Sequence, residues 1–172
     1  MPESTTSSLT TADRLAIHER LAACAWALDT GDADAFAGCF CTDGVLEWDA
    51  FEEPLSWQGR AALHHFAAFL RDLPTSAGRQ HHITNAVITP AEEGASVRSY
   101  VNVALRQGDG PHQLYVMGWY EDTFRHEDGQ WLLARRVIRD WSGPVLGRFA
   151  GQDGQRQARP MPPPLWPIRY PG

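Results

Sequence analysis

The chain has 172 residues, of which 43% are hydrophobic and 21% charged, and a formal net charge of -6. This size suits one globular domain that can enclose a core and a pocket. The negative charge argues against a nucleic-acid partner, because such partners are bound through clustered Lys and Arg. No apolar signal segment and no window near the ~18 apolar residues of a membrane span occur, so we expect a cytoplasmic protein that binds no membrane.

The first part of the chain has the pattern of helices and short strands. Apolar residues recur at helical spacing over 15–28, after an N-cap signal at 10–13 and before Gly31, which is suited to ending a helix. A second, shorter helix begins at Asp32 and is predicted to stop before Thr42-Asp43-Gly44, a turn signal. A strand, a further extended piece and a third helix are predicted at 45–48, 56–59 and 60–70.

From residue 81 onward the apolar residues nearly alternate with polar ones, which is typical of strands. Glu127-Asp128-Gly129 is a hairpin signal. Helices followed by long antiparallel strands predict an α+β fold, a cone-shaped barrel with the N-terminal helices packed on a strongly curved, mostly antiparallel sheet. The domain is predicted to span 10–146, between a disordered N-terminus (1–9) and an irregular Pro/Gly-rich tail (147–172). The long strands are expected at 81–89, 96–106, 113–125 and 131–141.

The cysteine and histidine residues do not have the spacing of a metal site. Cys24, Cys39 and Cys41 are odd in number and lie in apolar or helical surroundings, so we expect buried, reduced thiols. The seven His residues include two adjacent pairs, but neither has a carboxylate at ligand spacing. No phosphate loop, nucleotide fingerprint or nucleophile elbow occurs either, so we expect a protein that uses no metal and no cofactor.

The adjacent residues His81 and His82, at the start of the first long strand, are the main candidates for chemistry. Imidazole titrates near neutrality, so a carboxylate that orients it can make it a stronger general base. Asp29 is the candidate carboxylate, because an acid at the end of a helix opposes the helix dipole and needs another reason to be there. Alternation along a strand sends one of the two His residues inward and the other outward.

Further residues are predicted around a pocket. One residue of the pair Arg135-Arg136 must face inward, where it can stabilise developing negative charge; the alternative for Arg136 is a salt bridge with Asp122 or Asp140. Tyr120 is expected to assist Arg136 electrostatically. Aromatic, Asn and Met side chains predict a pocket for a small hydrophobic or aromatic substrate. The substrate-binding candidates are Trp26, Trp48, Phe51, Tyr100, Asn102, Tyr115, Met117 and Trp141.

Several short motifs occur in an order that resembles a known family. They are Leu28-Asp29-Thr30-Gly31-Asp32, His81-x-x-Thr84-Asn85, Gly118-Trp119-Tyr120-x-Asp122, and Asp128-Gly129-x-Trp131 followed by Arg135-Arg136. Together with the order of helices and strands, they resemble the SnoaL-like branch of the nuclear transport factor 2-like superfamily over about residues 10–142. Members of this branch include scytalone dehydratase, hexachlorocyclohexane dehydrochlorinase, bile acid dehydratases and polyketide cyclases.

The resemblance implies roles for several residues. In the eliminating members an Asp on the first helix hydrogen-bonds a His on the first long strand, and that His removes a proton from carbon. These positions fall on Asp29 and His81, and the Arg thought to assist the leaving group in the dehydrochlorinase falls on Arg136. The tyrosine pair of scytalone dehydratase is replaced by Leu28 and Trp48, so the resemblance does not extend to that enzyme's own substrate.

The expected function is a cofactor-independent lyase of the dehydratase type. Two alternatives stay open: an isomerase or cyclase of a polyketide or terpenoid in the same pocket, and a non-catalytic ligand-binding module like the small subunit of ring-hydroxylating dioxygenases. By analogy with the family, we also expect a homodimer or homotrimer.

Overall fold

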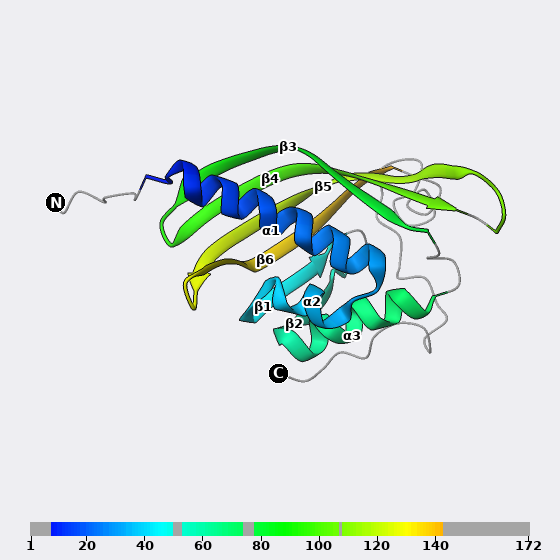
Figure 1. Ribbon diagram of the computed structural model, residues 1–172, viewed down its shortest axis with the longest axis horizontal. Helices are drawn as coiled ribbons and strands as arrows, with labels where there is room; N and C mark the ends of the chain where they lie inside the picture. The colour runs from blue at the N-terminus through cyan, green and yellow to red at the C-terminus, as the bar shows by residue number, and fades with distance from the viewer. Residues whose placement is uncertain (1–7, 50–52, 74–77, 107, 143–172) are drawn as a thin grey trace.

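A computed structural model of the chain describes residues 8–49, 53–73, 78–106 and 108–142, with side chains described as far as Arg139. Within these ranges lie three helices and six strands (Figure 1). None of these helices is both long and apolar enough to cross a lipid bilayer. Phe51 and the predicted tail from residue 147 lie outside the described residues. The helices and strands are α1 (Thr11–Thr30), α2 (Ala33–Gly38), β1 (Phe40–Trp48), β2 (Leu55–Gln58), α3 (Gly59–Asp72), β3 (Gln80–Ala91), β4 (Gly94–Arg106), β5 (His112–Glu127) and β6 (Gln130–Ser142).

The strands form one sheet in the order β2-β1-β6-β5-β4-β3. The neighbours β1 and β6 are parallel, and the other neighbouring pairs are antiparallel. Helix α1 crosses one face of the long, curved strands, whereas α2 and α3 lie near β1 and β2 (Figure 1). This arrangement confirms the predicted α+β fold, with the helices packed on one face of a curved and mostly antiparallel sheet.

Local side-chain chemistry determines where α1 begins and ends. The Thr10 hydroxyl accepts a hydrogen bond from the Asp13 backbone N–H, and the Asp13 carboxylate accepts one from the Thr10 N–H. This reciprocal capping satisfies backbone donors that no helical carbonyl can reach. Gly31 ends the helix with a φ of 76°, in the left-handed region that favours glycine. The sequence predicted both ends, and the last turn places Asp29 beside the start of β3.

One prediction about the first strand is wrong. Thr42-Asp43-Gly44 was expected to form a turn, but the three residues lie inside β1, where the register with β6 shifts between Phe40 and Val45. A Cβ on Gly44 would lie 2.9 Å from the Cβ of Phe40 and 3.0 Å from the carbonyl oxygen of Leu133. Gly44 is therefore needed for close packing within an irregular strand, and the turn signal coincides with the shift in register.

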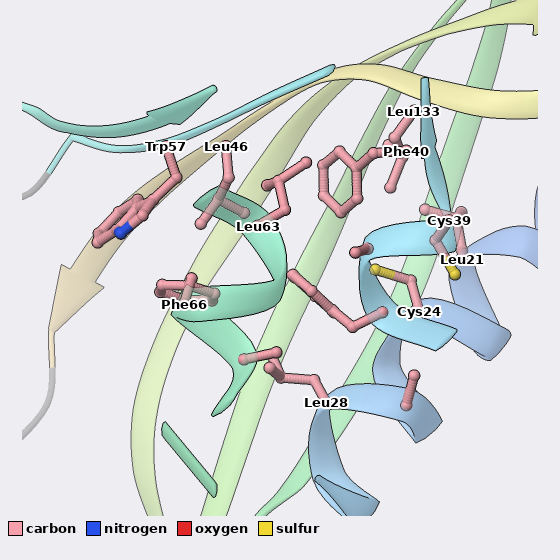
Figure 2. Packing of buried hydrophobic residues seen from close by; sticks show 14 of the residues in the cluster. Leu21, Cys24, Leu28, Cys39, Phe40, Leu46, Trp57, Leu63, Phe66 and Leu133 are labelled. Carbon is pink, nitrogen blue, oxygen red and sulfur yellow. The ribbon is translucent and has the colours of Figure 1, made fainter. Parts of the chain in front are cut away.

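The core lies between the helices and the inner face of the sheet. Figure 2 shows buried side chains of α1, α3, β1 and β2 that converge there. Aromatic rings pack closely, with centroids 5.3 Å apart for Phe36 and Phe40 and 4.7 Å apart for Trp57 and Phe66. The three cysteines are buried and make no disulfide, as predicted. Some of these core side chains, among them Phe36 and Phe66, also form the wall of a cavity.

Candidate active site

A cavity of about 370 Å³ lies between the helices and the inner face of the sheet, a size typical of a small-molecule site. Its wall is mostly apolar, with a few side chains that can donate, accept or carry charge. Within the described ranges, no group of three or more His, Cys, Asp or Glu residues could hold a metal ion. The apolar lining residues are Leu28, Phe36, Leu46, Trp48, Phe66, Leu70, Val101, Val103, Leu105, Val116 and Ile138, and the others are Arg79, His81, Tyr115, Tyr120 and Arg136.

The structure brings Asp29 and His81 together at the cavity wall. The Nδ1 atom of His81 lies 2.5 Å from Oδ1 of Asp29, and the His81 backbone N–H donates to Oδ2 at 2.7 Å. Both carboxylate oxygens therefore hold the same residue. The other ring nitrogen, Nε2, has no hydrogen-bond partner among the described residues. The neighbouring His82 is exposed, and its Nε2 lies 3.3 Å from the Gln80 side-chain oxygen. Of the two adjacent histidines, His81 is therefore the one that faces inward.

The protonation of His81 reflects competing effects. Burial lowers its pKa below the ordinary value of 6.5, and the nearby charges of Arg79 and Arg136 lower it further. The Asp29 carboxylate opposes these effects but does not outweigh them. This corrects the expectation that Asp29 would make His81 a stronger base. The imidazole is instead held in the neutral form at neutral pH, the form that can accept a proton.

Arg136 combines the two roles that the sequence left open. It lines the cavity, and its Nε and Nη2 donate to the two Asp122 oxygens at 2.8 and 2.7 Å. Its Cζ lies 4.1 Å from the centroid of the Tyr120 ring, a cation–π contact. Burial opposes its charge, but the Asp122 carboxylate outweighs burial and raises the pKa of Arg136. Arg135 instead lies outside the cavity and donates to Glu47 at 2.8 Å.

Arg79 is a cavity residue that the sequence motifs did not predict. Its side chain is 8% exposed, its Nη2 donates to the Leu28 carbonyl at 3.2 Å, and its Nε lies 3.8 Å from Oδ1 of Asp29. Burial lowers its pKa and Asp29 opposes that effect, but a guanidinium keeps its charge at any physiological pH. Its position two residues before His81 was the available signal, because residues two apart in extended chain share a face.

The predicted substrate-binding residues divide into two groups. Trp48 and Tyr115 line the cavity, as does Tyr120. Trp26 of α1 is 71% exposed, and the lining of the cavity does not include it. Tyr100, Asn102 and Met117 belong to the outer face of the sheet, because the alternate residues of β4 and β5 face inward. Phe51 and the side chain of Trp141 lie outside the described part of the chain.

Comparison with known proteins identifies the family. A model of the SnoaL-like domain matches residues 10–137. The chain belongs to the SnoaL-like domain family. This confirms the resemblance seen in the sequence motifs. No curated protein is similar to this SnoaL-like domain at a significant level.

Solved structures share the fold of this SnoaL-like domain. A protein of unknown function from Mycobacterium tuberculosis is 26% identical, with a TM-score of 0.69, over 79% of this chain and 80% of that one. A candidate scytalone dehydratase from Novosphingobium aromaticivorans is 27% identical, with a TM-score of 0.64, over 77% and 89%. From the same organism, the β subunit of a candidate aromatic-ring-hydroxylating dioxygenase is 22% identical, with a TM-score of 0.64, over 82% and 94%, which indicates a shared fold alone.

Proposed function

We propose that this SnoaL-like protein is a cofactor-independent lyase of the dehydratase type that acts on a small hydrophobic or aromatic substrate. The observation that carries the proposal is the double hold of Asp29 on His81, at Nδ1 and at the backbone N–H. With the Nδ1 proton directed at Asp29, Nε2 carries the lone pair that can take a proton from carbon. The similarity to a candidate scytalone dehydratase supports this reaction class.

The reaction begins with proton transfer to His81. Nε2 takes a proton from a carbon next to a carbonyl group, and the electron pair of the C–H bond forms a carbon–carbon double bond of an enolate. The carbonyl then re-forms, the bond from the β-carbon to its hydroxyl oxygen breaks, and the departing oxygen receives the proton from His81. The products are an unsaturated carbonyl compound and water, and His81 returns to its neutral form.

The surrounding residues supply the remaining rate enhancement. A positioned base contributes about 10²–10⁴-fold, so orientation and electrostatic stabilisation must provide the rest. Asp29 orients the imidazole and stabilises the imidazolium that forms. Arg136 and Tyr120 are positioned at the cavity wall to stabilise negative charge on the substrate. The mostly apolar wall strengthens each of these interactions, because it keeps the local dielectric constant low.

The proposal can be tested by exchange of substrate hydrogen with solvent deuterium. Wild-type protein is incubated in D₂O with a panel of hydroxylated aromatic and polyketide-like ketones, and the products are analysed by mass spectrometry. We expect deuterium incorporation and loss of the mass of one water, both abolished or strongly reduced in His81→Ala and Asp29→Asn. The matched control is His82→Ala, which removes the adjacent exposed imidazole and should leave both signals unchanged.

Two outcomes would change the assignment. Deuterium incorporation without loss of water, still dependent on His81 and Asp29, would indicate an isomerase or cyclase that shares the first proton transfer. Turnover that persists undiminished in His81→Ala would refute the base assigned here, whatever the product.

A further inference from the structure

Two guanidinium groups line the same small cavity as His81, and their surroundings differ. Arg136 directs Nε and Nη2 at Asp122 and Nη1 at the Cys24 sulfur, 3.5 Å away. Arg79 is held differently, with Nη2 on the Leu28 carbonyl at the end of α1 and Nε 3.8 Å from Asp29. That last distance exceeds a hydrogen bond, and both Asp29 oxygens accept from His81. Asp29, a carboxylate beside Arg79, is therefore already engaged by the proposed base.

Among the described residues named here, positive and negative charges balance only before the proton is transferred. The positive Arg79 and Arg136 are matched by the negative Asp29 and Asp122 while His81 is neutral. Proton transfer to His81 adds one positive charge in a mostly apolar cavity. Such an excess is costly at low dielectric unless an anion forms nearby. A substrate that becomes an enolate at this moment restores the balance.

Arg79 and His81 are neighbours at the cavity wall. Both side chains line the cavity, and Nε of Arg79 and Nδ1 of His81 lie 3.8 and 2.5 Å from the same oxygen, Oδ1 of Asp29. A carbonyl compound in the cavity can therefore direct a C–H group at the imidazole and its oxygen at the guanidinium. Arg79 is thus placed to contact the atom on which negative charge develops.

From this geometry we infer that Arg79 binds the carbonyl oxygen of the substrate and stabilises it as an enolate or phenolate oxyanion. The inference rests on the proposed function and specifies its substrate class, a compact apolar molecule in which an acidic C–H adjoins a carbonyl oxygen. The planar guanidinium donates N–H groups to the oxygen, and these bonds strengthen as the C–H electron pair forms the carbon–carbon double bond and the carbonyl π pair moves onto the oxygen. Arg136 stays paired with Asp122 and contributes its positive charge at the cavity wall.

The inference can be tested by the binding of an oxyanion probe that requires no turnover. The probe is 4-nitrophenol, whose anion and neutral acid absorb differently, and nitrobenzene serves as the ligand of similar shape without the phenolic oxygen. Wild-type protein should prefer the phenolate to nitrobenzene and should bind it as the anion. Arg79→Met should weaken phenolate binding by about 10- to 100-fold, the range of one charge-assisted hydrogen bond, and leave nitrobenzene binding within a few-fold.

Two further variants control for loss of charge and loss of fold. Arg14→Met removes a guanidinium that also donates to a backbone carbonyl, that of Ile88 at 2.9 Å, but lies outside the cavity lining, so phenolate binding should be unchanged. Arg79→Lys keeps the charge without the planar fork, and its phenolate preference should fall between those of wild type and Arg79→Met. If Arg79→Met does not fold, the comparison of Arg79→Lys with wild type decides the matter.

The results separate this inference from the proposed function. An unchanged preference for phenolate over nitrobenzene in either Arg79 variant would overturn the role of Arg79, even if the deuterium assay supports His81. Phenolate binding that depends on Arg79, together with turnover that does not depend on His81, would overturn the proposed base and leave the oxyanion site standing.

Discussion

The buried ion pair of Arg136 and Asp122 is predicted to be more sensitive to the loss of one partner than to the loss of both. Their side chains are 4% and 0% exposed and make two hydrogen bonds of 2.7 and 2.8 Å. Arg136→Met leaves a carboxylate buried without its counter-charge, which should lower the free energy of unfolding by about 3–5 kcal/mol. For a chain of this size, that corresponds to a melting temperature lower by roughly 6–20 °C.

The assay is urea unfolding followed by tryptophan fluorescence. The double variant Asp122→Leu/Arg136→Met should recover at least about half of the lost stability, because no unpaired charge remains. Arg135→Met, which removes the adjacent half-exposed partner of Glu47, should cost at most about 1 kcal/mol. Burial raises the pKa of Asp122, more so without Arg136, so the folded single variant binds a proton that the unfolded chain does not. The stability that Arg136→Met loses relative to wild type should therefore become smaller as the pH is lowered from about 7 to about 5. A double variant as unstable as the single one would refute this reasoning.

Three further predictions follow from the caps, the tight turns and the proposed base. Thr10→Ala should lower the free energy of unfolding by about 1 kcal/mol in urea titration, while Thr10→Ser should be neutral, because serine keeps the hydroxyl that accepts from the Asp13 N–H and alanine does not. Gly94→Ala should lower the free energy of unfolding by more than about 2 kcal/mol, since its Cβ would lie 2.1 Å from the Phe124 carbonyl oxygen at a φ of +118°. Gly38→Ala, whose Cβ would meet no atom within 4 Å, should be neutral or stabilising in the same titration. Because burial lowers the pKa of His81 below 6.5, the fall of kcat/KM at acid pH should have its midpoint below pH 6.5; a midpoint above 6.5 would contradict a neutral His81 as the base.

Short-range energetics explain why the sequence predicted most helix and strand positions. The capping pair at Thr10 and the left-handed Gly31 act within a few residues, so they can be read without knowing the rest of the fold. The hairpin at Asp128-Gly129 is of the same kind, with φ values of 52° and 75°. Local signals failed at Thr42-Asp43-Gly44, where the residues form an irregularity inside β1 instead of a turn that precedes the strand.

The pairing of Asp29 with His81 was predicted in part. Strand alternation and the family motifs indicated an oriented imidazole, but alternation alone does not say which of two adjacent residues faces inward. The two residues are 52 positions apart in the chain, and the packing of α1 on β3 brings them together. That packing also reversed the expected effect on His81, since burial and two guanidinium groups outweigh one carboxylate.

By itself, the sequence of this SnoaL-like protein determined the order of its elements, the fold class and an acid–histidine pair, because periodicity, caps and turns are encoded within short windows. Only the tertiary structure decided what the cavity contains. Trp26 and Tyr100 are exposed, whereas Arg79 lines the cavity. Arg136 also lines the cavity and is paired with Asp122. The physical reason is that exposure depends on which helix or strand covers each face, and those elements come from distant parts of the chain.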